Sequence, residues 1–221
     1  MAWFTRFTRF GDTHLVYAQE EENSCGIACV MMCVFKINKL RPGSQATYKE
    51  TEIYKAYDKH FKAMKPNVRG NKAYDGSIYS YATILAKTLN DLNCGTWEAK
   101  CLAETAVSQA VVDSVGTDIV GAGPLVNSIM RGYPIILLTR WDQGGGHFIV
   151  VDTVNSVFGR LYASVCDPWD GNVHITHFQT GKAFEYEAST PRFSWDLGGK
   201  RHEYSGSSGS TVRGWVIRRT N

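Results

Sequence analysis

Hydrophobic positions along this chain follow a helical spacing in its first part and a strand-like spacing in its last part. Before Gly132, apolar residues recur every three to four positions, which is the period of an amphipathic helix. Ser24 or Asn23 is suited to cap the first predicted helix, and Pro124 is suited to the first position of the last one. The predicted helices span residues 25–37, 48–64, 77–92, 105–115 and 124–131.

After Gly132 the pattern changes to apolar, β-branched runs of strand length with turn residues between them. The stretch 196–210 is rich in glycine and serine and predicts a loop or a long hairpin tip. We therefore expect one α+β domain over residues 1–221, with a mainly helical half (1–131) and a mainly antiparallel β half (132–221). The predicted strands lie within residues 133–141, 147–154, 160–167, 171–178, 182–188 and 211–219.

Composition and charge narrow the classes of protein. The 221 residues are 43% hydrophobic and 20% charged, which is typical of a folded domain, and the net charge of +3 is too small to indicate a nucleic-acid partner. No apolar run reaches the roughly 18–20 residues that span a membrane, and the N-terminus lacks the apolar region of a secretory signal. We expect a cytoplasmic protein, or one exported by a signal-peptide-independent system, with no membrane partner.

Three of the six cysteines lie on one face of the first predicted helix, at Cys25, Cys29 and Cys33. Cys25 occupies the first turn, where free N–H groups and the positive end of the helix dipole stabilise a thiolate. The other two lie further in and are predicted to be core residues. The outer two are about 12 Å apart along the helix, too far to share one ion. We expect no metal and no cofactor. Three cysteines within nine positions are not typical of a disulfide framework, which favours a reducing compartment.

The stretch "WDQGGGHFIVVD" places His147 at the start of a buried strand, directly after a run of glycines. Gly145 and Gly146 keep side chains away from the approach to the imidazole, as a bound substrate backbone would require. Trp141 flanks this stretch and is a candidate to line a subsite. The alternative is a hairpin turn followed by a buried structural histidine.

Two further residues complete a candidate site. Asp167 ends a predicted strand before Pro168 and can accept a ring N–H of His147, although it can equally serve as a turn residue. Asp152 and Asp170 are also near in sequence, but Asp152 points poorly from the strand of His147 itself, and Asp170 lies out in the turn. Gln19, six residues before Cys25, has an amide that can donate to an oxyanion.

Taken together, "Q-x5-C-G-x-A-C-x-x-M", "G-x-P-I-I-L-L", "G-H-F-I-V-V" and "D-P-W-D-G" resemble the papain-like cysteine peptidases. The likeness is to stand-alone relatives of the double-glycine leader peptidases, which trim bacteriocin precursors, and it covers residues 19–32 and 133–171. It implies a papain-like fold with Cys25 as nucleophile and His147 as general base. It also implies that Asp167 orients His147 and that Gln19 is the oxyanion donor.

The resemblance implies a hydrolase that cleaves peptide bonds of a protein or peptide substrate. The chain has neither the P-loop pattern nor the membrane segment of a peptide exporter, so cleavage after a double glycine is not expected to transfer. One expectation is a bacterial effector or toxin of narrow specificity, held in check by an inhibitory or immunity protein; the other is a processing role. The alternatives are a papain-like deamidase or acyltransferase, or a non-catalytic binding module. The acidic run at residues 20–22 favours a basic or neutral substrate.

Overall fold

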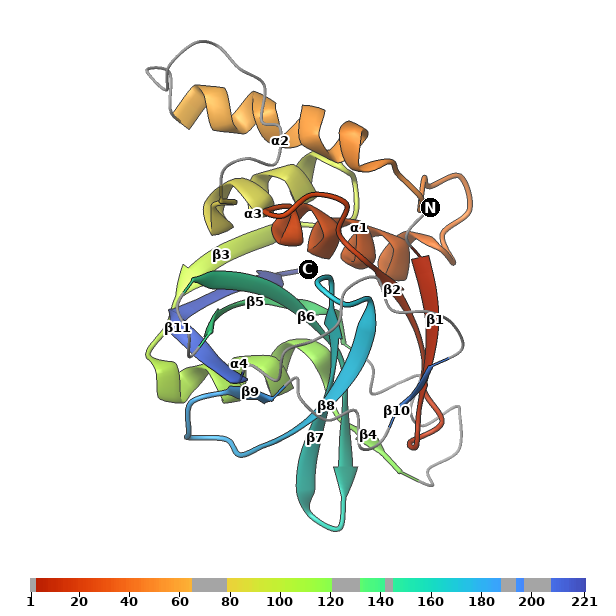
Figure 1. Ribbon diagram of the computed structural model, residues 1–221, viewed down its shortest axis with the longest axis vertical. Helices are drawn as coiled ribbons and strands as arrows, with labels where there is room; N and C mark the ends of the chain where they lie inside the picture. Colours follow the sequence, from red (N-terminus) through yellow and green to blue (C-terminus); the bar gives the residue numbers. More distant parts are fainter. Residues whose placement is uncertain (1–2, 65–78, 121–131, 142–144, 188–193, 197–207) are drawn as a thin grey trace.

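The structure, a computed structural model, describes residues 3–64, 79–120, 132–141, 145–187, 194–196 and 208–221 (Figure 1). It has a mixed α+β architecture, as predicted. Its helices within these ranges are α1 (Cys25–Asn38), α2 (Glu50–Met64), α3 (Ala82–Asp91) and α4 (Glu104–Val115). None of them is long and apolar enough to cross a membrane.

An eight-stranded sheet forms the centre of the molecule, and its strands run antiparallel except for the pairing of β4 with β6. In spatial order its main path is β3 (Trp97–Cys101), β11 (Ser208–Arg219), β5 (Ile135–Trp141), β6 (Gly146–Val157), β7 (Arg160–Asp167) and β8 (Asn172–Phe178). The short strand β4 (Asp118–Ile119) adds to β6, and β9 (Glu185–Glu187) adds to β11. A separate three-stranded sheet contains β10 (Ser194–Asp196), β1 (Trp3–Thr8) and β2 (Thr13–Tyr17).

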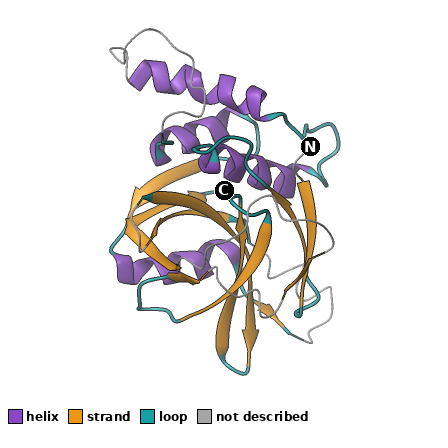
Figure 2. Ribbon diagram, viewed as in Figure 1, coloured by secondary structure: helices purple, strands orange, loops and turns teal. Residues whose placement is uncertain are grey.

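Helices cover both faces of the large sheet, with α1, α2 and α3 on one side and α4 on the other (Figure 2). Apolar residues of β5 and β6 that pack in the core formed with α4 are Ile135, Leu137, Ile149 and Val151. Alternate residues of the same strands pack in the core formed with the other three helices, namely Ile136, Phe148 and Val150. Burial on both faces explains why these two strands are continuously apolar in sequence.

Helix α1 lies in the middle of the larger core and is buried on all sides through its first ten residues. This explains its nearly uniform apolar composition, since a helix without a polar face must be surrounded by protein. Cys29 and Cys33 are fully buried, so their prediction as core residues is confirmed. Burial raises the pKa of both thiols well above the ordinary value, which keeps them protonated and unreactive.

The predicted helices at 25–37, 48–64 and 105–115 match α1, α2 and α4 to within two residues at each end. The helix predicted at 77–92 begins only at Ala82. Tyr81 is extended because its backbone N–H donates to the hydroxyl of Tyr57 in α2, at 2.9 Å, instead of starting a helix earlier. The helix predicted at 124–131 lies outside the described residues.

The N-terminal half is less purely helical than predicted, because β1, β2, β3 and β4 also lie in it. Strand β1 escapes recognition because Arg6 points inward. Its guanidinium is fully buried, lies 4.8 Å from the ring centre of Phe4 and donates through Nε to the carbonyl of Gly171 at 2.9 Å. A buried arginine interrupts the apolar alternation that would otherwise reveal a strand.

Gly26 lies where α1 packs closely against α3 and against Ser80, which precedes α3. A substitution at this position tests the packing. A Cβ atom here would lie 2.7 Å from the Cβ and Oγ of Ser80 and 2.8 Å from Cδ1 of Leu85. We predict that Gly26→Ala lowers the free energy of unfolding by about 1–3 kcal/mol, because overpacking outweighs the gain of about 1 kcal/mol that alanine brings to a helix. Urea denaturation followed by circular dichroism measures this change.

Gly146→Ala is the matched control, because its added Cβ would lie 3.4 Å from Cδ1 of Leu138, at the edge of ordinary contact. Its effect is expected to stay within about 0.5 kcal/mol, as for most surface substitutions. Equal losses of stability in the two variants would show that the short contacts of the added Cβ at Gly26 do not lower the free energy of unfolding.

Candidate active site

His147 and Asp167 meet at one end of the large sheet. Strands β6 and β7 are antiparallel neighbours, so the start of β6 and the end of β7 lie at the same end. The imidazole Nε2 of His147 lies 2.6 Å from Oδ1 of Asp167, and both side chains are buried. The structure therefore joins the histidine and the acid that the sequence singled out, whereas Asp152 and Asp170 pair with other histidines.

Three donors surround the carboxylate of Asp167. Besides His147, the backbone N–H of Trp169 donates to Oδ1 at 2.7 Å, and the hydroxyl of Tyr186 donates to Oδ2 at 2.6 Å. Burial raises the pKa of Asp167, but the charge and hydrogen bond of His147, with that of Tyr186, outweigh it and lower the pKa to about 2. The carboxylate is therefore ionised, and Tyr186 fixes its rotation so that Oδ1 faces the imidazole.

Two contacts from the N-terminal hairpin hold the turn that follows Asp167. The backbone N–H of Gln19, just after β2, donates to the carbonyl of Pro168 at 2.8 Å. Arg6 of β1 holds the carbonyl of Gly171 at the other side of the turn. Neither contact can be read from the sequence, because each joins segments about 150 residues apart or more.

Cys25 is the first residue of α1 and is 7% exposed. Its thiol contributes to the raised pKa of His147, after the larger contribution of Asp167. Because Nε2 of the imidazole lies against Asp167, a proton exchanged with the thiol would pass through Nδ1. Burial lowers the pKa of His147, but the charge and hydrogen bond of Asp167, followed by those of Cys25, raise it to about 10. The imidazole is thus protonated at neutral pH.

The start of α1 gives Cys25 a favourable electrostatic environment. The first-turn N–H groups of a helix lack intrahelical acceptors and carry the positive end of the helix dipole, and no acidic residue lies in this first turn. Ser24 takes the predicted cap position, but its side chain makes no capping bond; its hydroxyl instead lies 3.0 Å from the carbonyl of Glu21 and 3.2 Å from Oε1 of Glu50. The side chain of Ser24 therefore does not occupy the N–H groups of the first turn.

Gln19 is buried, and its amide group is not oriented as an oxyanion donor would be. Nε2 donates to the carbonyls of Glu21 and Glu22, at 2.8 Å in each case, so both amide hydrogens are committed to its own loop. In this arrangement Gln19 braces the loop before α1. Its role as an oxyanion donor stays a prediction, and it requires that one of these two bonds be exchanged for the substrate.

Two described glycines, Gly145 and Gly146, directly precede His147. Gly145 and Gly146 are both exposed, and Gly145 has a φ of 91°, a conformation that disfavours any residue with a Cβ. Their proposed contact with a substrate backbone stays a prediction. Trp141 ends β5, but the placement of its side chain lies outside the described part of the chain.

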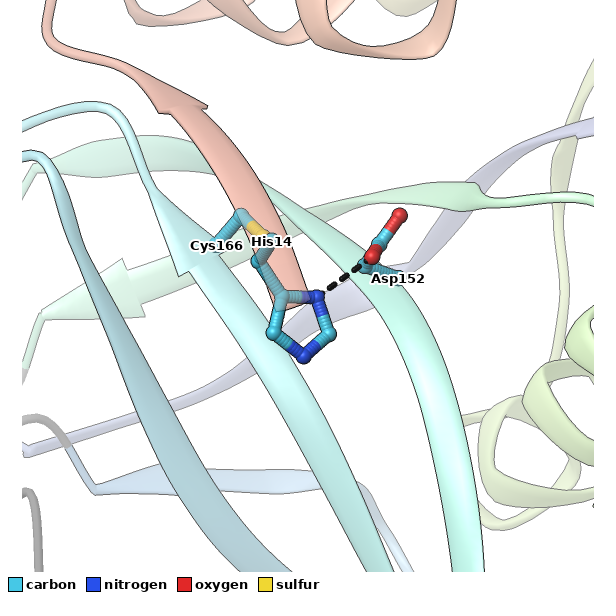
Figure 3. A group of neighbouring side chains, drawn as sticks. All are labelled: His14, Asp152 and Cys166. Carbon is cyan, nitrogen blue, oxygen red and sulfur yellow. Dashed lines mark hydrogen bonds and ion pairs between the residues drawn. The ribbon is translucent and has the colours of Figure 1, made fainter. Parts of the chain in front are cut away.

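One group of potential metal ligands lies outside this site, where the imidazole of His14 points at Asp152 beside Cys166 (Figure 3). Nδ1 of His14 is 2.5 Å from Oδ2 of Asp152, and the ammonium of Lys36 is 2.7 Å from Oδ1. The Asp152 carboxylate is thus already balanced by a cation, and burial raises the pKa of the Cys166 thiol, which disfavours ligation. The arrangement is a buried ion-pair cluster that ties α1 to β2 and β6.

A second group contains Asp167, Asp170 and His174, whose ligand atoms lie within 4.8 Å of one another. Nε2 of His174 is 2.9 Å from Oδ2 of Asp170, and both oxygens of Asp167 are engaged as described above. His177, on the same strand as His174, is exposed and lies against Tyr162. The ligand atoms of this group are therefore used by internal hydrogen bonds.

Comparison with models of known protein families finds no match, and no curated protein matches the chain in sequence. The resemblance of the motifs to papain-like cysteine peptidases therefore stays a prediction. So do the protein or peptide substrate, the inhibitory or immunity partner and the cytoplasmic or exported location. What the chain can do chemically is inferred below from the geometry of its own residues.

The dependence of His147 on Asp167 gives a second prediction. Asp167→Asn should lower the pKa of His147 from about 10 to below its ordinary value of about 6.5, because burial then dominates. An NMR titration of the imidazole resonances measures this shift. The raised pKa of His147 stabilises the folded protein below about pH 6.5, and this contribution is lost as the pH rises through 10. The stability of Asp167→Asn should therefore no longer fall over this pH range on account of His147.

Asp170→Asn is the control, since it removes a neighbouring buried carboxylate that contacts His174 rather than His147. The pKa of His147 should remain above about 9 in this variant, less than one pK unit from its original value. Equal shifts in the two variants, or none in Asp167→Asn, would contradict a specific pair.

Proposed function

We propose that this protein is a papain-like cysteine peptidase that hydrolyses peptide bonds through Cys25, His147 and Asp167. The observation that carries the proposal is the buried pair of His147 and Asp167, with Nε2 and Oδ1 2.6 Å apart, together with Cys25, which contributes to the raised pKa of His147. These residues come from the start of α1, the start of β6 and the end of β7. A nucleophile, a base and a group that orients the base are the parts that covalent acyl transfer needs.

The proposed mechanism begins with a Cys25 thiolate beside a His147 imidazolium. The sulfur attacks the carbonyl carbon of the substrate amide, and the imidazolium then gives its proton to the leaving amine, which leaves a thioester on Cys25. A water molecule loses a proton to the neutral imidazole and attacks the thioester, which releases the acid product and the thiolate. Asp167 stays ionised throughout and keeps the ring in position.

The negative oxygen that forms on the substrate carbonyl needs hydrogen-bond donors. The backbone N–H of Cys25, at the open end of α1, is available by the geometry of helix termini. A single donor of this kind is worth roughly 10²–10³ in rate. A second one would come from Gln19 if its amide turned away from the carbonyls of its loop.

The overall architecture also supports a papain-like assignment. A buried helix carries the cysteine at its first turn, and an antiparallel sheet that packs on this helix carries the histidine and the acid. The buried thiols of Cys29 and Cys33 lie behind the nucleophile as packing residues. In addition to this helix and sheet, the protein has an N-terminal hairpin that holds the turn after Asp167.

We predict that wild-type protein added to a cell lysate generates new peptide N-termini, and that Cys25→Ala and His147→Ala generate none. Cys25→Ala should keep the melting transition of the wild type, whereas His147→Ala should melt at a lower temperature but remain folded, because the buried carboxylate of Asp167 loses one of its three donors. Mass spectrometry of labelled N-termini measures the products. Cys101→Ala is the matched control, since Cys101 is an exposed cysteine, and it should retain full activity.

The same experiment separates the alternatives. A deamidase or acyltransferase would modify glutamine or asparagine side chains in a Cys25-dependent way without creating new N-termini. Unfolding of Cys25→Ala, or products that persist in it, would show that Cys25 is a structural residue and would remove the basis for a thiol hydrolase.

A further inference from the structure

A cavity of about 630 Å³ is lined by residues of the N-terminal hairpin, the loop before α1 and the start of α2. Its walls combine aromatic rings with carboxylates. None of these residues has a role in the proposed mechanism. The residues that line it are Trp3, Tyr17, Glu20, Thr47, Tyr48, Lys49, Glu50, Thr51 and Glu52.

Glu50 is the buried polar group of this cavity. Its side chain is only 3% exposed, and Oε1 accepts the backbone N–H of Glu20 at 3.0 Å and the hydroxyl of Ser24 at 3.2 Å. No donor among the described residues reaches Oε2. Burial raises the pKa of Glu50 to about 7, against the hydrogen bond from Glu20. Glu50 lines the cavity, and a carboxylate with an oxygen that accepts no bond from the described residues is a group that a ligand cation can pair with.

The remaining charges of the cavity are also mainly negative. Glu20 and Glu52 line it with Glu50, against the single ammonium of Lys49. Glu52 uses Oε2 to accept the backbone N–H of Lys49, at 2.7 Å, at the start of α2. Three carboxylates therefore face one ammonium, and the cavity attracts a cation.

The aromatic walls suit the stem and the face of a long basic side chain. Trp3 and Tyr17 lie edge to face, with ring centres 5.0 Å apart, and Tyr48 lines the cavity beside Glu50. Aromatic rings bind alkyl stems by apolar contact and bind guanidinium or ammonium groups by cation–π attraction. A carboxylate beside such rings adds a charge-assisted hydrogen bond.

We infer that this cavity binds an arginine or lysine side chain of the polypeptide substrate, with the charged head group donating to Oε2 of Glu50. This inference rests on the proposed peptidase function and adds to it the class of residue that is recognised. Ser24 contacts Glu50 and directly precedes Cys25, so a substrate held in the cavity lies along the loop that leads to the nucleophile.

The binding should strengthen between pH 6 and pH 8, because Glu50 ionises in this range. The other charged groups around Glu50 are Glu20 and Glu21 of the loop before α1, Lys49 directly before α2, and Glu52 of α2. If only the ionised Glu50 binds the cation, the affinity rises about tenfold between these two pH values.

The test uses the Cys25→Ala protein, which cannot turn over substrate, and two small probes. Butylguanidine carries the head group of arginine, and butylurea is its uncharged counterpart of nearly the same shape. Titrations followed by NMR should show saturable binding of butylguanidine to the cavity residues, at least tenfold tighter than that of butylurea. Glu50→Gln, combined with Cys25→Ala, should abolish this preference, while Glu104→Gln at the exposed start of α4 should keep it.

Absence of saturable binding, equal binding of the two probes, or an unchanged preference in Glu50→Gln would overturn the inference. Glu20→Gln provides a second variant if Glu50→Gln does not fold, and it should weaken the preference. Because the assay needs no catalysis, it is independent of the lysate experiment: a cation site without cleavage would leave this inference and remove the peptidase proposal. Cleavage without a cation site would do the reverse.

Discussion

The buried carboxylate of Asp167 can remain ionised only because three donors surround it, and much of the structure serves to bring those donors together. His147 comes from the neighbouring strand, Trp169 from the turn and Tyr186 from β9. An ion in a dry site is stable when its hydrogen bonds are complete and is very costly otherwise. The arrangement of β6, β7 and β9 at this end of the sheet is therefore narrowly constrained, and the position of the imidazole follows from it.

The same principle distinguishes the two chemical environments of the cysteines. Cys29 and Cys33 are surrounded by apolar side chains, with no donor set to stabilise a thiolate, and they contribute volume to the core. Cys25 lies one turn before Cys29, at the open end of α1, and it contributes to the raised pKa of His147. One buried helix thus supplies core residues and, at its first position, the candidate nucleophile.

Local sequence was sufficient to predict that His147 and Asp167 contact each other, because each stands at the end of a strongly patterned element. The catalytic roles of these residues and of Cys25 stay predictions. Local sequence was also sufficient to prefer Asp167 to Asp152, whose position on the strand of His147 itself directs it elsewhere. The roles of Arg6, Tyr186 and Glu50 could not be predicted, because their partners are distant in sequence and leave no periodic pattern. The amide orientation of Gln19 was missed for a related reason, since it depends on the path of the loop carbonyls.

The pairing of β9 with β11 has a consequence for biosynthesis. Tyr186 lies opposite Gly209 of β11, and β11 itself inserts between the edge strand β3 and β5. While the ribosome is still making β11, β3 has no partner in the sheet and β9 lacks the strand with which it pairs. A nascent chain therefore cannot complete the set of donors around Asp167 until β11 has been synthesised.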